Sequence, residues 1–449
     1  MTIAIIIVFF IGYLFITLEG SLKVNKTAIA LLLSVALWTL YIVGAASYLP
    51  ETATLADLAK FKESIVEESF IKHVGDTSEI IFFLLGAMTI VEVVDANGGF
   101  NFVRNKLACK RKHSLLWKIT FIAFILSAIL DNLTTTIVMV MVLRKLVTDK
   151  QTRMLYCGMV VIAANAGGAF SPIGDVTTIM LWVKGNVTTM GVIRELILPS
   201  LATVLIPACV MHWRMKGKLQ PMVKDPEDQG EKYDFSLTQR NVVFYVGVGG
   251  LIFVPIFRSL TGLPPFVGVI LVLSILWIIT EFFYSARKIS SNRANRVSRV
   301  LHSIDLSTIL FFLGILMAVA VLEDIKVLAT FGKFLDELTS GNHYLVTGII
   351  GVASSIVDNV PLVASCMGMY PDMVGDFAPD GIFWQLLAFC AGTGGSILII
   401  GSAAGVVVMG LEKISFGWYL KQFSLLAFIG MLSGMGCYYL QNLVVGMLM

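Results

Sequence analysis

The chain alternates between long apolar segments and short polar ones. Apolar residues dominate Thr2–Leu18, Ala28–Ala46, Val242–Phe257 and Val267–Phe283, among other segments of similar length. A helix needs about 20 predominantly apolar residues to cross the hydrocarbon core of a bilayer. The pattern therefore predicts many membrane-spanning helices. The first is expected to be a retained helix, because it lacks the basic start and the small-residue cleavage site of a signal peptide.

The composition favours the same class of protein. Hydrophobic residues make up 57% of the 449 positions and charged residues only 14%, whereas a soluble domain carries about 25% charged residues. One soluble core could not bury so much apolar surface. We therefore predict an all-α polytopic membrane protein surrounded by a lipid bilayer, with no feature that suggests nucleic-acid binding and no cofactor.

The sequence also contains an internal duplication. Ser127–Asn132 aligns with Ser354–Asn359, and Ala164–Gly168 aligns with Ala391–Gly395, at the same offset of 227 positions. Aligned blocks in the same order predict two copies of one design, each much longer than a solenoid repeat. The predicted parts are a first repeat at 1–213, a cytoplasmic linker at 214–240 and a second repeat at 241–449.

Each repeat is expected to hold five spanning helices, one of them interrupted, and one re-entrant helical hairpin. In the first repeat the spans are predicted near 2–18, 27–48, 79–94, 155–184 (interrupted) and 191–213, with the hairpin at 114–147. In the second they are predicted near 241–258, 264–284, 306–322, 382–412 (interrupted) and 417–445, with the hairpin at 343–370. An odd number of spans gives the two copies opposite orientations, which makes them inverted-topology repeats.

Charged loops give an independent prediction of the orientation. Basic residues cluster at 104–113, 144–153 and 287–299, whereas 51–76 and 372–380 are acidic. Because basic residues favour the cytoplasmic side, the three basic stretches are expected inside and the acidic ones outside. This arrangement predicts both termini outside. The membrane itself is expected to be a bacterial inner (plasma) membrane.

Two Asp-Asn pairs lie midway along the predicted hairpins, Asp131 with Asn132 and Asp358 with Asn359. An ionised Asp at the centre of a membrane costs about 2.5–3.5 kcal/mol even on a lenient insertion scale. Such a residue needs protein partners, water or a bound cation to offset that cost. The two pairs are therefore candidates for an ion site.

A structural role is the alternative for these pairs. Asp and Asn often cap helices, and the threonines after Asn132 or Pro361 after Asn359 would suit the first turn that follows. We expect both roles to hold together. The pair interrupts the hairpin and caps the returning helix, while its oxygens remain available as ligands.

A second motif interrupts a spanning segment in each repeat. The first runs from Asn165 to Asp175, with Thr177 and Thr178 after it, and the second runs from Gly392 to Ser402. The residues that favour the breaks are Gly167, Gly168, Pro172 and Gly174 in the first repeat and Gly394, Gly395 and Gly401 in the second. Close helix packing by small residues is the alternative. Breaks at matching positions of two repeats, however, are typical of a transporter's binding site.

At these residues the sequence resembles the NhaD-type sodium/proton antiporters, a group within a superfamily that includes divalent-anion/sodium symporters and arsenite permeases. The motifs that carry the resemblance are Leu130–Thr136, Asn165–Thr178 and Val357–Pro361. The resemblance implies a secondary transporter and not an enzyme. It further implies a homodimer with a static scaffold and a mobile transport unit that moves by an elevator-like alternating access.

Within the superfamily, the hairpin residues favour a cation. Anion symporters resemble this layout but carry Ser-Asn-Thr at their hairpin tips, whereas Asp131 and Asp358 replace that serine here. Added negative charge repels an anion and favours Na⁺ or Li⁺, exchanged for H⁺, with Na⁺ expected at Asp131, Asp175 and Asp358. The predicted cation and proton site comprises Asp131, Asn132, Thr134, Thr135, Asn165, Asp175, Thr177, Thr178, Asp358, Asn359, Thr393, Ser396 and Ser402.

Other functions remain open on the sequence. One is an arsenite or other anion-linked permease of the same superfamily. Another, from a different class, is a membrane-embedded aspartyl hydrolase, because paired Asp residues can serve as an acid/base dyad. Such a dyad would not require inverted repeats or paired helix breaks, which is why the transporter is preferred.

Overall fold

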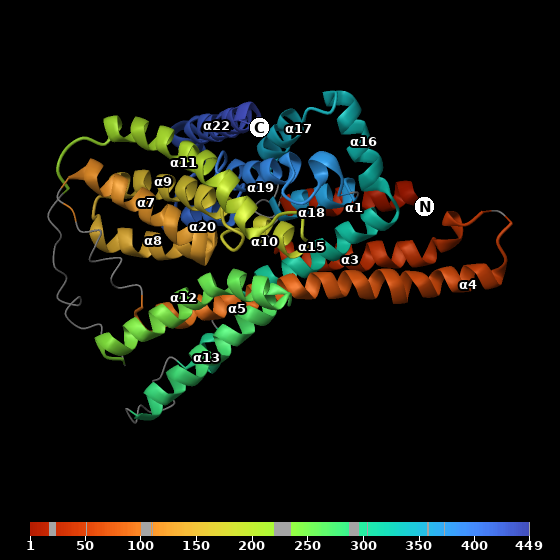
Figure 1. Cartoon of the computed structure of the whole chain (residues 1–449), viewed down its shortest axis with the longest axis horizontal. Helices are drawn as coiled ribbons and strands as arrows, with labels where there is room; N and C mark the ends of the chain where they lie inside the picture. The colour runs from red at the N-terminus through yellow and green to blue at the C-terminus, as the bar shows by residue number, and fades with distance from the viewer. Residues whose placement is uncertain are drawn as a thin grey trace. The chain divides into compact units, whose positions relative to one another are not determined.

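The computed structural model describes residues 1–17, 24–50, 52–99, 109, 111–219, 235–286, 296–302, 304–356, 359–371 and 373–448. Helices are the only extended regular elements in these ranges (Figure 1). Among the described residues, eight helices are long and apolar enough to cross a membrane: Lys26–Val43, Leu55–Ala96, Lys112–Leu130, Thr189–Arg214, Leu237–Thr261, Pro265–Ala286, Leu306–Asp324 and Phe416–Val444. The prediction of an all-α polytopic membrane protein is confirmed.

The chain divides into two compact units. Unit 1 comprises Met1–Leu84, Asp305–Asn342 and Val360–Val374. Its elements are α1 (Thr2–Thr17), α3 (Lys26–Val43), η1 (Ala45–Tyr48), α4 (Leu55–Ser64), η2 (Ile65–Phe70), the first part of α5 (Ile71–Ala96), α15 (Leu306–Asp324), α16 (Val327–Thr339) and most of α18 (Asn359–Met369).

Helices α3 and α15 pack closely at the centre of unit 1. The indole Nε1 of Trp38 donates a hydrogen bond of 2.9 Å to the carbonyl of Met317. Gly314 lies directly against the backbone of Ala30, where any larger side chain would collide. A small residue and a satisfied indole N–H are thus what allow this close helix pair inside an apolar unit.

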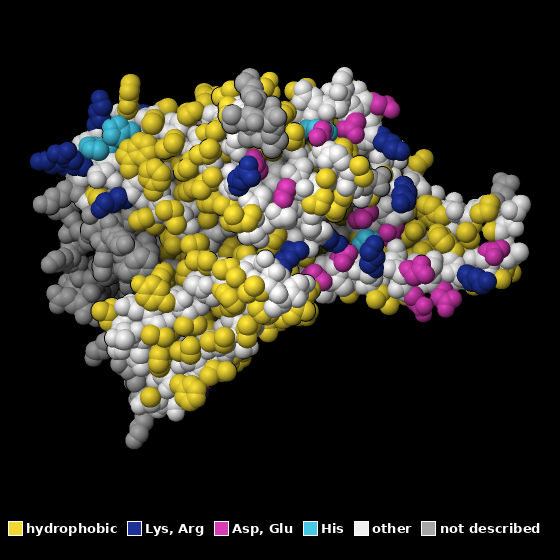
Figure 2. Space-filling model, in the orientation of Figure 1, with side chains coloured by type: hydrophobic (Ala, Val, Ile, Leu, Met, Phe, Trp, Pro, Cys, Tyr) yellow, Lys and Arg dark blue, Asp and Glu magenta, His cyan; other side chains and the backbone are white. Residues whose placement is uncertain are grey.

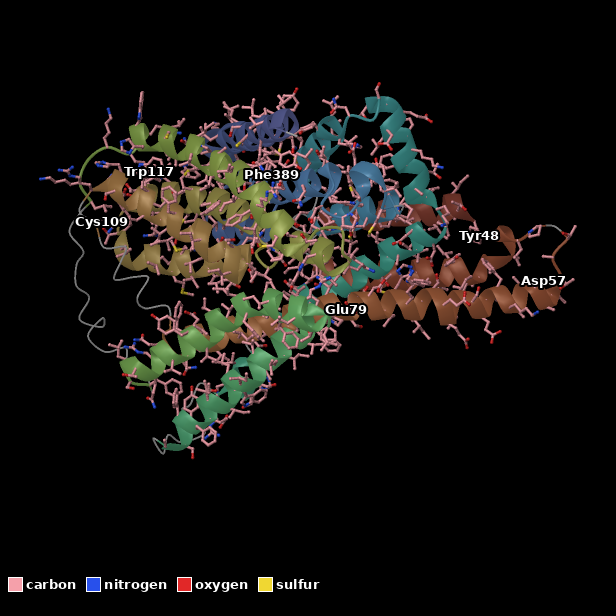
Figure 3. The ribbon with its side chains drawn as sticks, viewed as in Figure 1. Tyr48, Asp57, Glu79, Cys109, Trp117 and Phe389 are labelled. Atoms are coloured by element: carbon pink, nitrogen blue, oxygen red, sulfur yellow. The ribbon has the colours of Figure 1, made fainter. Side chains whose placement is uncertain are left out.

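One long helix differs from its predicted extent. The span expected at 79–94 belongs to a continuous helical stretch of 42 residues, Leu55–Ala96. It begins with a capping box in which Thr54 and Asp57 bond each other's backbone N–H groups, and Figure 3 marks Asp57 near the start of α4. The acidic residues of this stretch resemble a loop in the sequence, but polar residues are also typical of a capped helix that extends beyond the apolar layer.

Unit 2 comprises Leu85–Ile304, His343–Asn359 and Gly375–Met449. Its first part contains α7 (Lys112–Leu130), α8 (Asn132–Leu146), α9 (Lys150–Ala169), α10 (Val176–Val183), α11 (Thr189–Arg214), α12 (Leu237–Thr261), α13 (Pro265–Ala286) and α14 (Val297–Val300). Its second part contains α17 (His343–Ala353), η4 (Gly375–Phe377), α19 (Ile382–Gly394), α20 (Ala403–Glu412), α21 (Phe416–Tyr419), η5 (Leu420–Ser424) and α22 (Leu425–Leu448).

The interior of unit 2 is formed by α9 and α19. Every residue of α19 from Phe383 to Thr393 is buried, and Phe389, labelled in Figure 3, is 0% exposed. By contrast, hydrophobic side chains cover the outer surfaces of α12 and α13 (Figure 2), among them Ile252 and Phe282. Exposed apolar faces on long helices are what a protein presents to lipid.

Contacts inside unit 2 recur at the offset found in the sequence. The Ser127 hydroxyl donates to the carbonyl of Ala164 at 2.6 Å, and the Ser354 hydroxyl donates to the carbonyl of Ala391 at 2.7 Å. Each pair joins the first arm of a predicted hairpin to the helix that precedes a break. The recurrence supports the internal duplication.

Close glycine contacts recur in the same way. Gly167 lies against the carbonyl of Phe124, and Gly394 lies against the carbonyl of Gly351. A Cβ at either glycine would collide with that backbone, so both copies require glycine to bring these helices together. The opposite orientation of the copies and the side of each loop stay predictions, and most of the predicted linker, residues 220–234, lies outside the described ranges.

Candidate functional site

Asp175 occupies the break between α9 and α10. Helix α9 ends at Ala169 and α10 begins at Val176, so the segment between them is not helical. As the N-cap of α10, Asp175 accepts hydrogen bonds at Oδ1 from the backbone N–H of Thr177 at 3.0 Å and from its hydroxyl at 2.9 Å. Only 1% of Asp175 is exposed. The break therefore places a carboxylate deep inside unit 2.

Backbone packing explains why this segment unwinds. Gly168 lies against the backbone of Gly174, and Gly174 in turn lies against the carbonyl of Ser127 on α7. Larger residues at these two glycines could not fit. Pro172, between them, has no backbone N–H to continue a helix. The chain is thus folded back tightly enough to present Asp175 toward the interior.

The second repeat contains a matching break. Helix α19 ends at Gly394 and α20 begins at Ala403, with Gly395, Ser396 and Gly401 in between. Ser402 caps α20, and its hydroxyl oxygen accepts from the N–H of Gly405 at 3.2 Å. Ser402 stands where Asp175 stands in the first repeat, so the equivalent caps differ by one negative charge.

Asp131 lies between the arms of the first hairpin, α7 and α8. Its backbone has φ = +85°, a conformation that non-glycine residues rarely adopt and that costs about 1–3 kcal/mol. Its carboxylate caps α8 by accepting from the N–H of Thr134 at 2.7 Å and from the Thr134 hydroxyl at 2.8 Å. Asp131 is also close enough to Asp175 for the two carboxylates to interact electrostatically.

A chain of buried hydrogen bonds connects both breaks to α8. The Nδ2 group of Asn132 donates to Asp175 Oδ2 at 2.7 Å and to Asn165 Oδ1 at 3.1 Å. The Nδ2 group of Asn165 donates to the hydroxyls of Ser396 and Ser402, both at 2.9 Å. All five side chains are buried. The structure thus brings together residues that are more than 200 positions apart in the sequence.

The second Asp-Asn pair is described only in part. Asp358 lies outside the described residues. Asn359 is the first residue of α18, and its Nδ2 group lies 3.5 Å from Asp175 Oδ1, at the outer limit of a hydrogen bond. Pro361 follows within the first turn of α18, where a missing N–H is tolerated.

The predicted threonines fall into two groups. Thr134 and Thr177 bond the carboxylates that cap their helices, and the Thr393 hydroxyl donates to the carbonyl of Phe389 within α19. In contrast, the hydroxyls of Thr135 and Thr178 are buried and have no hydrogen-bond partner in the described part of the chain. An unsatisfied buried hydroxyl costs about 1–3 kcal/mol. Thr135 lies on the helix that Asp131 caps, and Thr178 lies on the helix that Asp175 caps.

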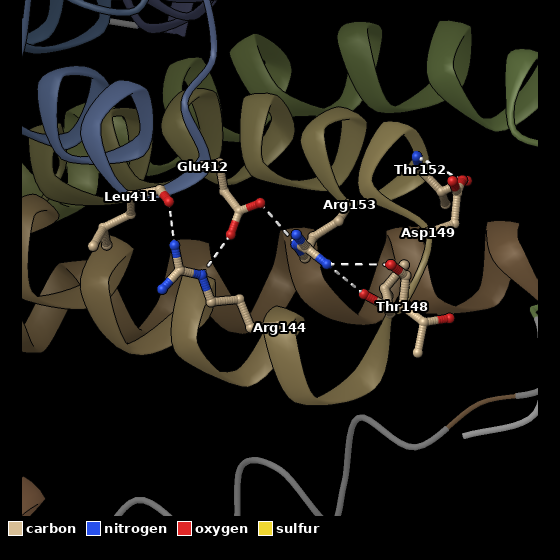
Figure 4. A network of polar contacts seen from close by, with 8 residues as sticks. Arg144, Thr148, Asp149, Thr152, Arg153, Leu411 and Glu412 are labelled. Carbon is tan, nitrogen blue, oxygen red and sulfur yellow. Dashed lines mark hydrogen bonds and ion pairs between the residues drawn. The ribbon is translucent and has the colours of Figure 1, made fainter. Parts of the chain in front are cut away.

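Sequence reasoning missed a buried ionic network at the end of α20 (Figure 4). The carboxylate of Glu412 accepts from Nε of Arg144 and from Nε of Arg153, each at 2.7 Å. Arg144 also bonds the carbonyl of Leu411. The side chain of Glu412 is only 1% exposed. The available signal was a lone glutamate at the end of an apolar helix, but the arginines were interpreted only as markers of a cytoplasmic loop.

The loop beside this network is held by a helix cap. Asp149 precedes α9 and accepts from the backbone N–H of Thr152 at 3.0 Å and from its hydroxyl at 2.5 Å. Both bonds hold the pKa of Asp149 below its ordinary value, and the bond from the Thr152 hydroxyl has the larger effect. Asp149 therefore stays ionised at neutral pH and fixes the start of the helix that leads to Asn165.

Comparison with known proteins places the chain in a family. Residues 13–387 match the citrate transporter family. The chain is 45% identical to sodium/proton antiporter 1 of Arabidopsis thaliana, over 97% of this chain and 72% of that protein. It is 42% identical to sodium/proton antiporter 2 of the same plant, over 96% of this chain and 98% of that protein. It is 30% identical to the Na⁺/H⁺ antiporter NhaD of Vibrio cholerae, over 93% of this chain and 87% of that protein. This chain is therefore a membrane transporter and not an enzyme, and it belongs to the citrate transporter family and, within it, to the NhaD-type sodium/proton antiporters.

Proposed function

We propose that this protein exchanges Na⁺ (or Li⁺) for H⁺ across a membrane, with Asp175 as the central carboxylate of the exchange site. The observation that carries the proposal is the burial of Asp175 beside the amide of Asn132, 2.7 Å away. An amide N–H stabilises a carboxylate but does not neutralise it. A carboxylate buried at this depth can take up either a proton or a cation, and each lowers the cost of burying its charge.

The surrounding oxygens suit a hard cation. Asp131 and Asp175 contribute negative charge, and the hydroxyls of Thr135 and Thr178 are buried without partners among the described residues. Carboxylate, hydroxyl and carbonyl oxygens are the ligands that hard cations prefer, and interrupted helices supply them in sodium-coupled transporters. We extend the proposed site to Asp358, whose position in the duplicated motif matches that of Asp131.

Exchange follows if cation and protons compete for the same carboxylates. A carboxylate that binds a proton has lost the charge that holds Na⁺, and one that binds Na⁺ excludes the proton. The site then carries Na⁺ in one direction and protons in the other as it opens alternately to the two sides. Such coupling requires no separate path for the proton.

We further propose an elevator-type homodimer in a bacterial plasma membrane, with both termini outside. The family resemblance and the duplication support this arrangement. The contacts that recur 227 positions apart join hairpin arms to interrupted helices, which is the combination that a mobile transport unit must keep intact. Two of the matched relatives are plant proteins, so fractionation of the native cell is the direct test of the membrane.

The decisive experiment is exchange by purified protein in sealed vesicles, read as the change in internal pH after Na⁺ or Li⁺ is added. Asp175→Asn removes the charge but keeps an oxygen that can cap α10. We expect this variant to reconstitute and to lose exchange at every pH. The matched control is Asp57→Asn, because Asp57 is an exposed carboxylate at the start of α4. Wild-type exchange by Asp175→Asn would refute the proposal.

The match to citrate transporters favours one second candidate, an anion-linked carrier such as an arsenite permease. Two interacting carboxylates at the site argue against it, because they repel an anion. The same vesicles distinguish the candidates when Na⁺ is replaced by citrate or arsenite as the added solute. Uptake of either anion without a Na⁺-dependent pH change would favour the second candidate.

A further inference from the structure

We infer that Ser396 and Ser402 are positioning residues that act through Asn165 to orient the amide of Asn132, so that its nitrogen, and not its carbonyl oxygen, faces the carboxylate of Asp175 and stabilises the charged form that binds the cation. This inference rests on the proposed function and assigns the two serines a role other than direct ligation. It follows from counting the donors and acceptors along the chain of buried hydrogen bonds.

The first step concerns Asn165. Its amide nitrogen carries two hydrogens, and these are directed to the hydroxyls of Ser396 and Ser402, 2.9 Å away in each case. With the nitrogen facing the serines, the carbonyl oxygen of the planar amide must face the other way. That oxygen accepts from Nδ2 of Asn132 at 3.1 Å.

The second step concerns Asn132. One hydrogen of its amide nitrogen is directed to Asn165, and the other is directed to Asp175 Oδ2 at 2.7 Å. An ionised carboxylate can only accept, so the nitrogen end of Asn132 must face Asp175. The amide nitrogen of Asn132 thereby stabilises the charged form of Asp175, which is the form that binds a cation.

The third step excludes Ser402 as a direct ligand. Its hydroxyl oxygen accepts from Asn165 and also from the N–H of Gly405 at 3.2 Å. A hydroxyl oxygen has two lone pairs, and both are used. Ser396 is anchored in a different way, because its backbone carbonyl accepts from the Tyr419 hydroxyl at 2.8 Å. Both serines are thus fixed points to which the amides are attached.

Comparison of the two repeats shows that this chain of hydrogen bonds, from the two serines through Asn165 to Asn132, exists in one copy. The residues 227 positions before Ser396 and Ser402 are Ala169 and Asp175, and the residue 227 positions after Asn165 is Gly392. None of these three can form the same chain of amide and hydroxyl bonds. The serines of the second repeat therefore serve the carboxylate of the first, which makes them specific parts of a single asymmetric site.

The inference is tested by measuring Na⁺-dependent exchange in vesicles for Ser396→Ala, Ser402→Ala and the double variant. Either serine alone can still hold the Asn165 nitrogen, so we expect each single change to raise the KM for Na⁺ less than about threefold. The double variant frees the amide and should raise KM by about tenfold or more, beyond the product of the single effects. The maximal rate should stay near the wild-type value, because the carboxylates that exchange Na⁺ and H⁺ are untouched.

Two further variants separate orientation from helix capping. Ser402→Thr keeps the hydroxyl that holds the Asn165 nitrogen, so its KM should lie closer to the wild-type value than the KM of Ser402→Ala does. Ser402→Gly removes the hydroxyl but costs only a few tenths of a kcal/mol as an N-cap, so it replaces Ser402→Ala if that variant unfolds. The melting temperature of each variant is recorded beside KM, because a loss of stability alone would not change KM selectively.

Three outcomes decide the question. A synergistic rise in KM with an unchanged maximal rate supports the inference. Independent effects that simply multiply would indicate two separate ligands and overturn it. A wild-type KM in the double variant would also overturn the inference. If Asp175→Asn is inactive in the same assay, the proposed function would still stand. Exchange by Asp175→Asn would instead refute the proposed function itself.

Discussion

The two described carboxylates of the site differ in how they are held. Asp131 is bonded by a threonine of its own helix, whereas Asp175 is bonded by Thr177 and, across helices, by the amide of Asn132. The sequence could identify these residues because a carboxylate or amide in an apolar segment carries a large cost unless it is compensated. It could not identify the bonds from Asn165 to Ser396 and Ser402, because these depend on the relative rotation of helices from different repeats.

The strained backbone of Asp131 leads to a prediction for that residue. Asp131→Asn should fold normally, because Asn tolerates positive φ and can accept from the Thr134 N–H as a helix cap. The charge is lost, however, so the KM for Na⁺ should rise by about tenfold or more, the effect of roughly 1.4 kcal/mol. Vesicle exchange and thermal unfolding of the same preparation measure the two quantities.

Asp131→Ala is the comparison that isolates the cap. Alanine is strained at φ = +85° and offers no oxygen to Thr134, so this variant should lose melting temperature as well as affinity. If Asp131→Asn exchanges Na⁺ with an unchanged KM, Asp131 serves only as the cap of α8 and takes no part in binding.

At the scale of elements, the ends of three helices are joined through Glu412. It lies at the end of α20, while Arg144 lies near the end of α8 and Arg153 near the start of α9 (Figure 4). The network attaches the returning arm of the first hairpin to an interrupted helix of the second repeat. Sequence analysis could place each of these helices, because apolar runs and breaks mark them. It could not pair their ends, because charge at a helix end also fits an ordinary solvated loop.

Breaking this network should destabilise the protein more than it affects binding. Glu412→Gln leaves the guanidinium groups of Arg144 and Arg153 without their carboxylate. Because the side chain of Arg144 is 43% exposed, water replaces part of the lost interaction, and the cost should be smaller than the about 3–5 kcal/mol of a fully buried ion pair. We therefore expect a clear fall in the melting temperature of the detergent-purified protein, with the KM for Na⁺ little changed in the folded fraction. Glu67→Gln makes the same chemical change at an exposed position and should leave the melting temperature where it was. Equal melting temperatures for Glu412→Gln and the wild type would contradict a stabilising role.

At the scale of the whole molecule, the hydrophobic pattern predicted the class of fold well. Every predicted spanning or hairpin segment overlaps a helix of the structure, because the bilayer forces backbone groups to pair within helices. The extension of one helix back to Leu55 was not predicted, since its acidic residues resemble a loop. The orientation of the repeats depends on the positions of charges relative to a membrane, which the arrangement of the helices alone does not specify.

Labelling of single cysteines tests that orientation. Lys150 and Asp376 are both exposed and are predicted to lie in a basic cytoplasmic loop and an acidic outer loop, respectively. In a background without the native cysteines, Lys150→Cys should react with an impermeant maleimide only after the membrane is opened. Asp376→Cys should react in intact cells. Reaction of both from the same side would rule out inverted repeats.

Competition between Na⁺ and protons makes a prediction about pH that concerns the whole transport cycle. If both bind the same carboxylates, raising the pH removes the competitor. The apparent affinity for Na⁺ should then rise with pH and level off once the carboxylates are fully ionised. Each Na⁺ that binds below that plateau should release protons to the solvent. Isothermal calorimetry of the purified protein, repeated in buffers with different ionisation enthalpies, counts these protons, because the observed heat changes with the buffer in proportion to the number released.

The informative range is about pH 6–9, which lies above the ordinary pKa of an aspartate and around that of a histidine. Asp175→Asn is the matched control, since without that carboxylate both the Na⁺ heat and its buffer dependence should disappear. Na⁺ binding with no proton release anywhere in this range would show that the two ions do not share a site. A transporter that binds Na⁺ in this way would move it together with another solute, and the buried carboxylates would then serve binding alone.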